Sequence, residues 1–213
     1  MRLANFMYGS YTGLSWTMFM LIPSFTAMFG RSALPQIAGA WTLGNRNEFE
    51  RKVTVVLRSN FVIGFPLYLG LSAMSRQILE FLFSGRQQEV SVSATSLFIL
   101  GLGGVFLTLS STFISIFQVI GRSDLPVKLM LPGCAVKLIF NVFTISVPAI
   151  NINGAAVSTV IMYAAVALGG YFALENVTGI DFHIIRRMAV PLSAGVVCAV
   201  VSRIVYGLSL IHI

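Results

Sequence analysis

The chain has 213 residues, of which 56% are hydrophobic and 10% are charged, and its mean hydropathy is +0.87. Soluble domains of this length are far less apolar, so the composition predicts an all-α polytopic membrane helix bundle. The net charge of +7 is interpreted as connector charge that orients the bundle in the bilayer, and nucleic acid is not expected as a partner.

Apolar stretches long enough to cross a hydrocarbon core of about 30 Å alternate with short polar connectors. They predict about six transmembrane helices, at about 11–41, 53–74, 92–117, 126–147, 155–174 and 188–206. The first stretch is longer than a bilayer needs and contains Pro23 and Pro35, so we expect kinks and a part that follows the interface. Arg31 lies about ten residues before the end of this stretch at Trp41, and it either snorkels to the interface or serves a binding site.

The third stretch carries a stripe of polar side chains. Thr108, Ser111, Ser115 and Gln118 recur every three to four residues, which places them on one face of a helix. Hydrogen bonding between helices is the ordinary explanation of such a stripe. The alternative is that Ser115 and Gln118 help to bind a substrate.

The fourth stretch has a basic residue, Lys137, at its centre. Asn141 follows Lys137 by one helical turn and Gly133 precedes it by one, so the three share a face. A charged side chain facing lipid at this depth costs about 2.5–3.5 kcal/mol. Lys137 and Asn141 therefore predict a binding cavity, and a lysine bonded to backbone carbonyls or to Asn141 is an equal alternative.

Small residues open the fifth stretch, in the segment GAAVSTV that begins at Gly154, and they predict close packing between helices. Cys134 and Cys198 both fall inside apolar stretches, so we expect buried thiols and no disulfide framework. Residues 208–213, LSLIHI, match the translation of a sequencing adapter. We expect one lobe over residues 1–207 and a non-native tail over 208–213.

The basic residues of the connectors predict the orientation. One side of the expected topology holds eight, namely Arg46, Arg51, Lys52, Arg58, Arg122, Lys128, Arg186 and Arg187, and the other holds Arg2, Arg76, Arg86 and Arg203. The richer side is expected to be cytoplasmic, which places both ends of the chain outside. Since the start of the chain does not read as a signal peptide, we expect a fragment whose amino-terminal lobe is missing.

Motifs of catalysis are absent from the sequence. No phosphate-binding loop, metal-binding HExxH or CxxC, or GxSxG nucleophile motif is present, so we expect no enzyme, no cofactor and no metal site. All seven acidic residues fall in or beside connectors. Proton or sodium relays usually need a carboxylate at mid-depth, which weakens the hypothesis of an ion-coupled antiporter.

Several segments together resemble a known family. SALPQIAGAW and GNRNEF, then FQVIGRSDLP, then Gly133, Lys137 and Asn141, and finally INGAAVST follow in order over about four-fifths of the chain. This pattern resembles the polysaccharide and lipid-linked oligosaccharide flippases, in the branch that contains stage V sporulation protein B and its relative the lipid II flippase. Gln36, Gly39 and Trp41 depart from the family's usual residues.

The resemblance implies one lobe of a two-lobe transporter in the bacterial cytoplasmic membrane. Such a transporter flips an undecaprenyl-diphosphate-linked saccharide by alternating access, and basic residues of its central cavity hold the diphosphate. Lys137, Asn141, Arg31, Gln118 and Ser115 are the candidate binding residues here. The alternatives are a cation-coupled multidrug antiporter of the same superfamily and a non-transporting membrane scaffold for envelope synthesis.

Overall fold

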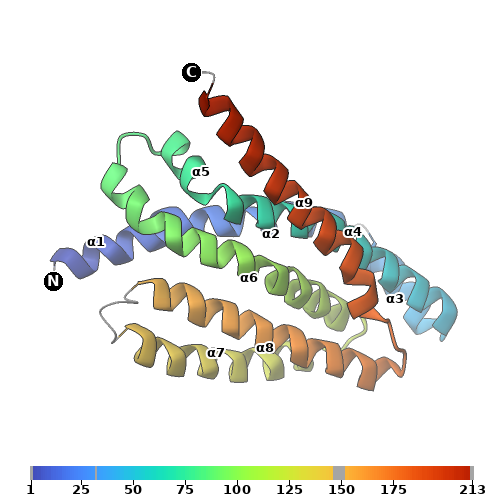
Figure 1. Ribbon diagram of the computed structural model, residues 1–213. Coiled ribbons are helices and arrows are strands. Elements are labelled where there is room, and N and C mark those ends of the chain that lie inside the picture. The colour runs from blue at the N-terminus through green and yellow to red at the C-terminus, as the bar shows by residue number, and fades with distance from the viewer. Residues whose placement is uncertain (1, 32, 146–151, 212–213) are drawn as a thin grey trace.

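Helices make up most of the chain that the structure describes. The structure is a computed structural model that describes residues 2–31, 33–145 and 152–211, and these residues include no strand. The elements in chain order are α1 (Arg2–Ser10), the π-helix η1 (Tyr11–Trp16), α2 (Thr17–Arg31), α3 (Leu34–Thr42), α4 (Arg46–Ala73), α5 (Ser75–Leu82), α6 (Gln87–Val119), α7 (Asp124–Ile145), α8 (Asn153–Thr178) and α9 (Ile184–Ile211) (Figure 1). The all-α bundle expected from the composition is confirmed.

Within the described residues, five helices are long and apolar enough to cross a membrane. They are α4, α6, α7, α8 and α9. The first expected stretch, 11–41, has a different form. Helix runs without a break from Arg2 to Arg31 through α1, η1 and α2, and α3 starts anew at Leu34. Pro35 lies in the first turn of α3, where the missing N–H of proline costs nothing, whereas Pro23 lies inside α2.

The ends of the long helices follow ordinary capping chemistry. The side chain of Asn45 accepts a hydrogen bond from the backbone N–H of Glu48 at 3.1 Å and starts α4. Gly179 ends α8 with a φ of 64°, a conformation that glycine adopts without strain. These two caps lie close together, because Arg46 Nη2 donates to the carbonyl oxygen of Thr178 at 2.9 Å.

α6 lies at the centre of the bundle, between α4 and α8 (Figure 1). α9 packs on α4 and α7 packs on α8, so these two helices are outermost. Close approach at the centre depends on Gly104, where a Cβ atom would lie 2.0 Å from the ring of Tyr68.

The outer helices leave most of their apolar surface uncovered. In the most apolar 18-residue stretch of α6, 67% is buried, whereas the corresponding stretches of α7 and α9 are each 11% buried. This surface is available to lipid or to further helices. The expectation of buried thiols is wrong for the same reason, since Cys134 of α7 and Cys198 of α9 are both exposed.

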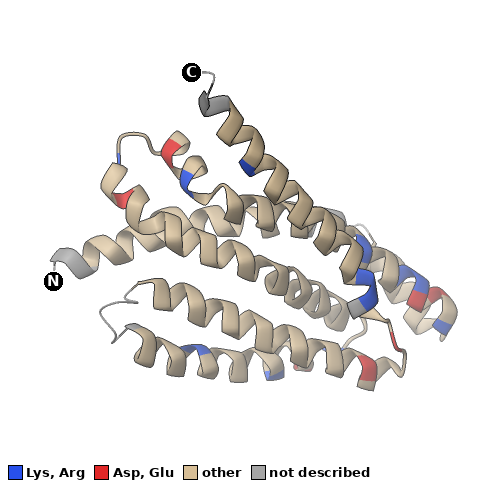
Figure 2. Cartoon of the chain, in the orientation of Figure 1, with Lys and Arg blue, Asp and Glu red and all other residues tan. Residues whose placement is uncertain are grey.

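Charged residues gather at the two ends of the bundle (Figure 2). At one end, the start of α4 meets the start of α9, where Arg187 pairs with Glu50. At the other end, α5 carries a pair between Arg76 and Glu80. Fewer charged residues lie between these two ends in Figure 2, and Lys137 is one that lies in the middle of its helix, α7.

Candidate functional site

A cavity of about 360 Å³ lies between the amino-terminal helical run, α7 and α8. Its walls carry aromatic rings, hydroxyls, one amide and one amine. The lining residues are Tyr8, Tyr11, Thr12, Trp16, Lys137, Asn141, Ile152, Ala155 and Thr159. No acidic side chain is among them, so the electrostatic potential of the cavity is positive.

Lys137 extends into this cavity from the middle of α7. It follows Asp124 by 13 residues, which is about 20 Å along an α-helix. Its Nζ atom lies 5.5 Å from the centroid of the Trp16 ring, within range of a cation–π interaction. Among the described residues Lys137 has no acidic partner and no hydrogen-bond acceptor. Its charge is therefore neutralised by neither an ion pair nor backbone carbonyls.

Asn141 lies one turn further along α7 and lines the same cavity. Its Oδ1 atom accepts a short hydrogen bond from the hydroxyl of Ser158 on α8. This bond fixes the orientation of the amide, and the Nδ2 atom has no acceptor among the described residues, so it can donate into the cavity. The shared face predicted for Lys137 and Asn141 therefore lies on one cavity wall.

Gly133 explains how α7 approaches α8 closely enough to form this wall. A Cβ atom at Gly133 would lie 2.8 Å from Cγ2 of Val166 on α8, closer than side chains normally pack. The hydroxyl of Ser158 reaches Asn141 across the same interface. The small and polar face recognised in the sequence is thus the face on which the two helices meet.

The π-helix η1 forms the opposite wall and could not be read from the sequence. It supplies Tyr11, Thr12 and Trp16 to the cavity. π-Helical turns are rare and occur often at functional sites. Two hydrogen bonds fix η1 and the end of α1 to α6: Ser15 Oγ of η1 donates to the Ser93 carbonyl at 2.9 Å, and Ser93 Oγ donates to the carbonyl of Ser10, the last residue of α1, at 3.0 Å.

Two of the other three candidate residues, Ser115 and Gln118, do not line this cavity. Ser115 and Gln118 lie near the end of α6, beside the start of α7 and far from Lys137 along the bundle. Ser115 Oγ donates to the Ser111 carbonyl at 2.9 Å, and Gln118 is exposed. Arg31 is the last residue of α2, and its side chain lies outside the described residues. A binding role for these three stays a prediction.

The polar stripe of α6 forms fewer hydrogen bonds between helices than expected. Thr108 and Ser111, like Ser115, donate to carbonyls of α6 itself. Bonds between helices come from neighbouring positions instead. Asn60 Nδ2 donates to Thr112 Oγ1 at 3.0 Å, and Ser110 Oγ donates to the Tyr163 carbonyl at 3.0 Å. Within the described residues, no group of three or more potential metal ligands is present.

Comparison with known proteins gives a family. The family model described as lipid II flippase MurJ matches residues 1–212. The chain is 22% identical over 188 residues to lipid II flippase MurJ of Bacillus subtilis, an alignment that covers 87% of this chain and 34% of that protein. It is 28% identical over 143 residues to an uncharacterized membrane protein of Methanocaldococcus jannaschii, covering 67% of this chain and 27% of that protein.

The chain thus spans about a third or less of the length of these curated relatives. The flippase relationship expected from the sequence motifs agrees with the matched family model. The finer assignment to the branch of stage V sporulation protein B stays a prediction.

Proposed function

The chain belongs to the lipid II flippase MurJ family, and from this premise we propose that it forms one lobe of a membrane transporter. The cargo is a saccharide linked to undecaprenyl diphosphate, and the membrane is the bacterial cytoplasmic membrane. The transporter moves the cargo by alternating access and makes or breaks no bond. The multi-pass bundle and the family support this proposal.

The observation that carries the proposal is the uncompensated amine of Lys137 in a cavity without acids. A diphosphate is recognised by a cation together with neutral hydrogen-bond donors, and bonds to a charged group are about twice as strong as neutral ones. Lys137 supplies the cation, and Asn141 Nδ2 supplies a donor one turn away. Tyr11, Thr12 and Thr159, which carry hydroxyl groups, line the same cavity.

The rim of the cavity suits the remainder of such a cargo. The ring of Trp16 covers the Lys137 amine on one side, and sugar rings stack on aromatic faces in the same way as apolar groups. The cavity volume of about 360 Å³ accommodates a diphosphate with part of a sugar, and the rest extends beyond it. We propose that further helices, packed on the exposed face of α7, complete the site as a second lobe.

Substitution of Lys137 by methionine tests the role of the charge. We expect transport of a fluorescent undecaprenyl-diphosphate saccharide, measured in liposomes that contain the complete transporter with both lobes, to fall about tenfold or more. Lys137→Arg should keep most of the activity, because it keeps the charge. The matched control is Lys128→Met, which removes the same group from the same helix but outside the cavity, where Lys128 pairs with Asp124 at 2.9 Å.

Transport by Lys137→Met within twofold of the Lys128→Met control, at equal protein level, would contradict the proposal. A multidrug antiporter would instead be indicated by efflux of cationic dyes, and such a carrier usually binds its coupling ion through a carboxylate. None of the described residues that line the cavity carries a carboxylate, and this favours the flippase that we propose.

A further inference from the structure

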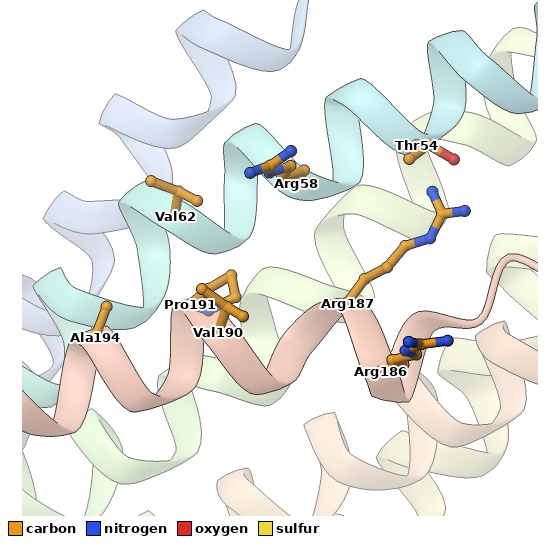
Figure 3. A pocket seen from close by; sticks show the side chains of 8 residues that line it. All are labelled: Thr54, Arg58, Val62, Arg186, Arg187, Val190, Pro191 and Ala194. Carbon is orange, nitrogen blue, oxygen red and sulfur yellow. The ribbon is translucent and has the colours of Figure 1, made fainter.

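A second hollow, of about 480 Å³, lies between α4 and α9 (Figure 3). We call it the arginine groove because Arg58 of α4 and Arg186 and Arg187 of α9 line it. The two helices run side by side in the same direction, since Gly195 lies against Phe65 and Arg203 Nη1 donates to the Ala73 carbonyl at 2.7 Å. None of the residues that line the Lys137 cavity lines this groove.

The charges of the groove are largely uncompensated. Arg187 lies 3.9 Å from Glu50, at the limit of an ion pair. Arg58 and Arg186 are exposed and have neither an acidic partner nor a hydrogen-bond acceptor among the described residues. In Figure 3 the side chain of Arg187 reaches from α9 towards Thr54 on α4. The hydroxyl oxygen of Thr54 is buried and has no hydrogen-bond partner.

The rest of the groove is apolar. Val62 on α4 and Val190 and Pro191 on α9 line it beyond the arginines. Val62 is 51% exposed and Val190 is 72% exposed, so this wall is open to its surroundings. Arg187 and Glu50 belong to a charged end of the bundle, and Val190 and Val62 lie further along the same two helices, within apolar stretches. The groove therefore crosses the boundary at which a membrane changes from headgroups to acyl chains.

We propose that the arginine groove binds an anionic membrane phospholipid. Guanidinium groups match the geometry of phosphate oxygens, and their donors can bind two of these oxygens at once. The acyl chain lies along Val62, Val190 and Pro191. Charge complementarity selects an anionic headgroup over a zwitterionic one, because each basic residue near the membrane surface contributes about 1 kcal/mol. This site is independent of the transport proposed for the Lys137 cavity.

Lipid binding to a double variant tests the groove. Purified protein in a neutral detergent is titrated with phosphatidylglycerol and, separately, with phosphatidylcholine of the same acyl chains, and bound lipid is counted by native mass spectrometry. We expect Arg58→Gln with Arg186→Gln to weaken phosphatidylglycerol binding about tenfold or more and to leave phosphatidylcholine binding unchanged. Neither arginine has a partner in the described part of the protein, so the variant should fold.

The matched control is Arg51→Gln with Arg122→Gln, which removes the same charge from exposed positions outside the groove. Equal weakening in the control and the groove variant would overturn the proposal, as would equal affinity of the unchanged protein for the two lipids. In the last part of the experiment, inorganic phosphate is added to the protein with its bound lipid. If millimolar phosphate displaced the lipid completely, the site would be one for free phosphate, and the part assigned to the apolar wall would be wrong.

Discussion

The Lys137 cavity and the arginine groove are both basic, but they hold their charge in different ways. Lys137 is half-buried in the middle of a helix and is covered by one aromatic ring. The arginines lie near a charged end of the bundle, and Arg58 and Arg186 are exposed. The comparison teaches that the same type of basic residue has different requirements at different depths in the membrane. A basic residue at the membrane surface is ordinary, whereas one at mid-depth requires a polar cavity.

The largest effect that separates the two regions should come from packing. Gly133→Val inserts side-chain atoms where even a Cβ lies 2.8 Å from Val166, and we expect about 1–3 kcal/mol of destabilisation. Thermal unfolding in detergent, followed by tryptophan fluorescence, should show a lower midpoint. Ala194→Val makes a similar change in the exposed wall of the groove and should have almost no effect. Equal shifts would mean that α7 and α8 are not closely packed.

A smaller effect should follow from removing the ring that covers Lys137. Trp16→Leu removes a cation–π interaction of about 1 kcal/mol. This free energy corresponds to roughly a fivefold change in the fraction of the Lys137 amine that is free to react. We expect the Lys137 amine to react about fivefold faster with an amine-specific reagent, measured by mass spectrometry of the labelled peptide. Lys128, which is exposed, is the internal control and should react at an unchanged rate. An unchanged rate at Lys137 would show that the ring does not protect it.

The smallest effect belongs to the ion pair at the edge of the groove. Arg187 and Glu50 are 3.9 Å apart and partly exposed, so the pair should contribute less than about 0.5 kcal/mol to stability. Glu50→Gln should therefore leave the unfolding midpoint unchanged within error, while freeing Arg187 to bind an anion. A clear fall in the midpoint would assign the arginines a structural role and would weaken the contrast between the two regions.

Much of the Lys137 wall could be predicted from the sequence, because it depends on local periodicity. Gly133, Lys137 and Asn141 recur every four residues, and the structure places the latter two on one cavity. The opposite wall could not be predicted. The π-helix η1 is tied to α6 by Ser15 and Ser93, which are 78 residues apart, and no local pattern records such a contact.

The arginine groove was missed for a related reason. Arg58, Arg186 and Arg187 are assigned in the sequence to connectors, where they serve as evidence of orientation. Their proximity depends on α4 lying beside α9, whose residues are more than a hundred positions further along the chain. The proposed roles of Ser115 and Gln118 rested on spacing alone. Spacing identifies one face of α6 but does not give the depth of a residue in the membrane. It therefore could not show that Ser115 and Gln118 lie at a different depth from Lys137.

The paired serine bonds between η1 and α6 also have a mechanical consequence. Ser15 of η1 donates to the backbone of α6, and Ser93 of α6 donates to the backbone of Ser10 at the end of α1, so a shift of the aromatic wall that leaves α6 in place breaks both bonds. α6 has 33 residues and is about 50 Å long, enough to reach from one aqueous phase to the other. If α6 tilts by a few degrees about the position of these serines, its opposite end moves by several ångströms.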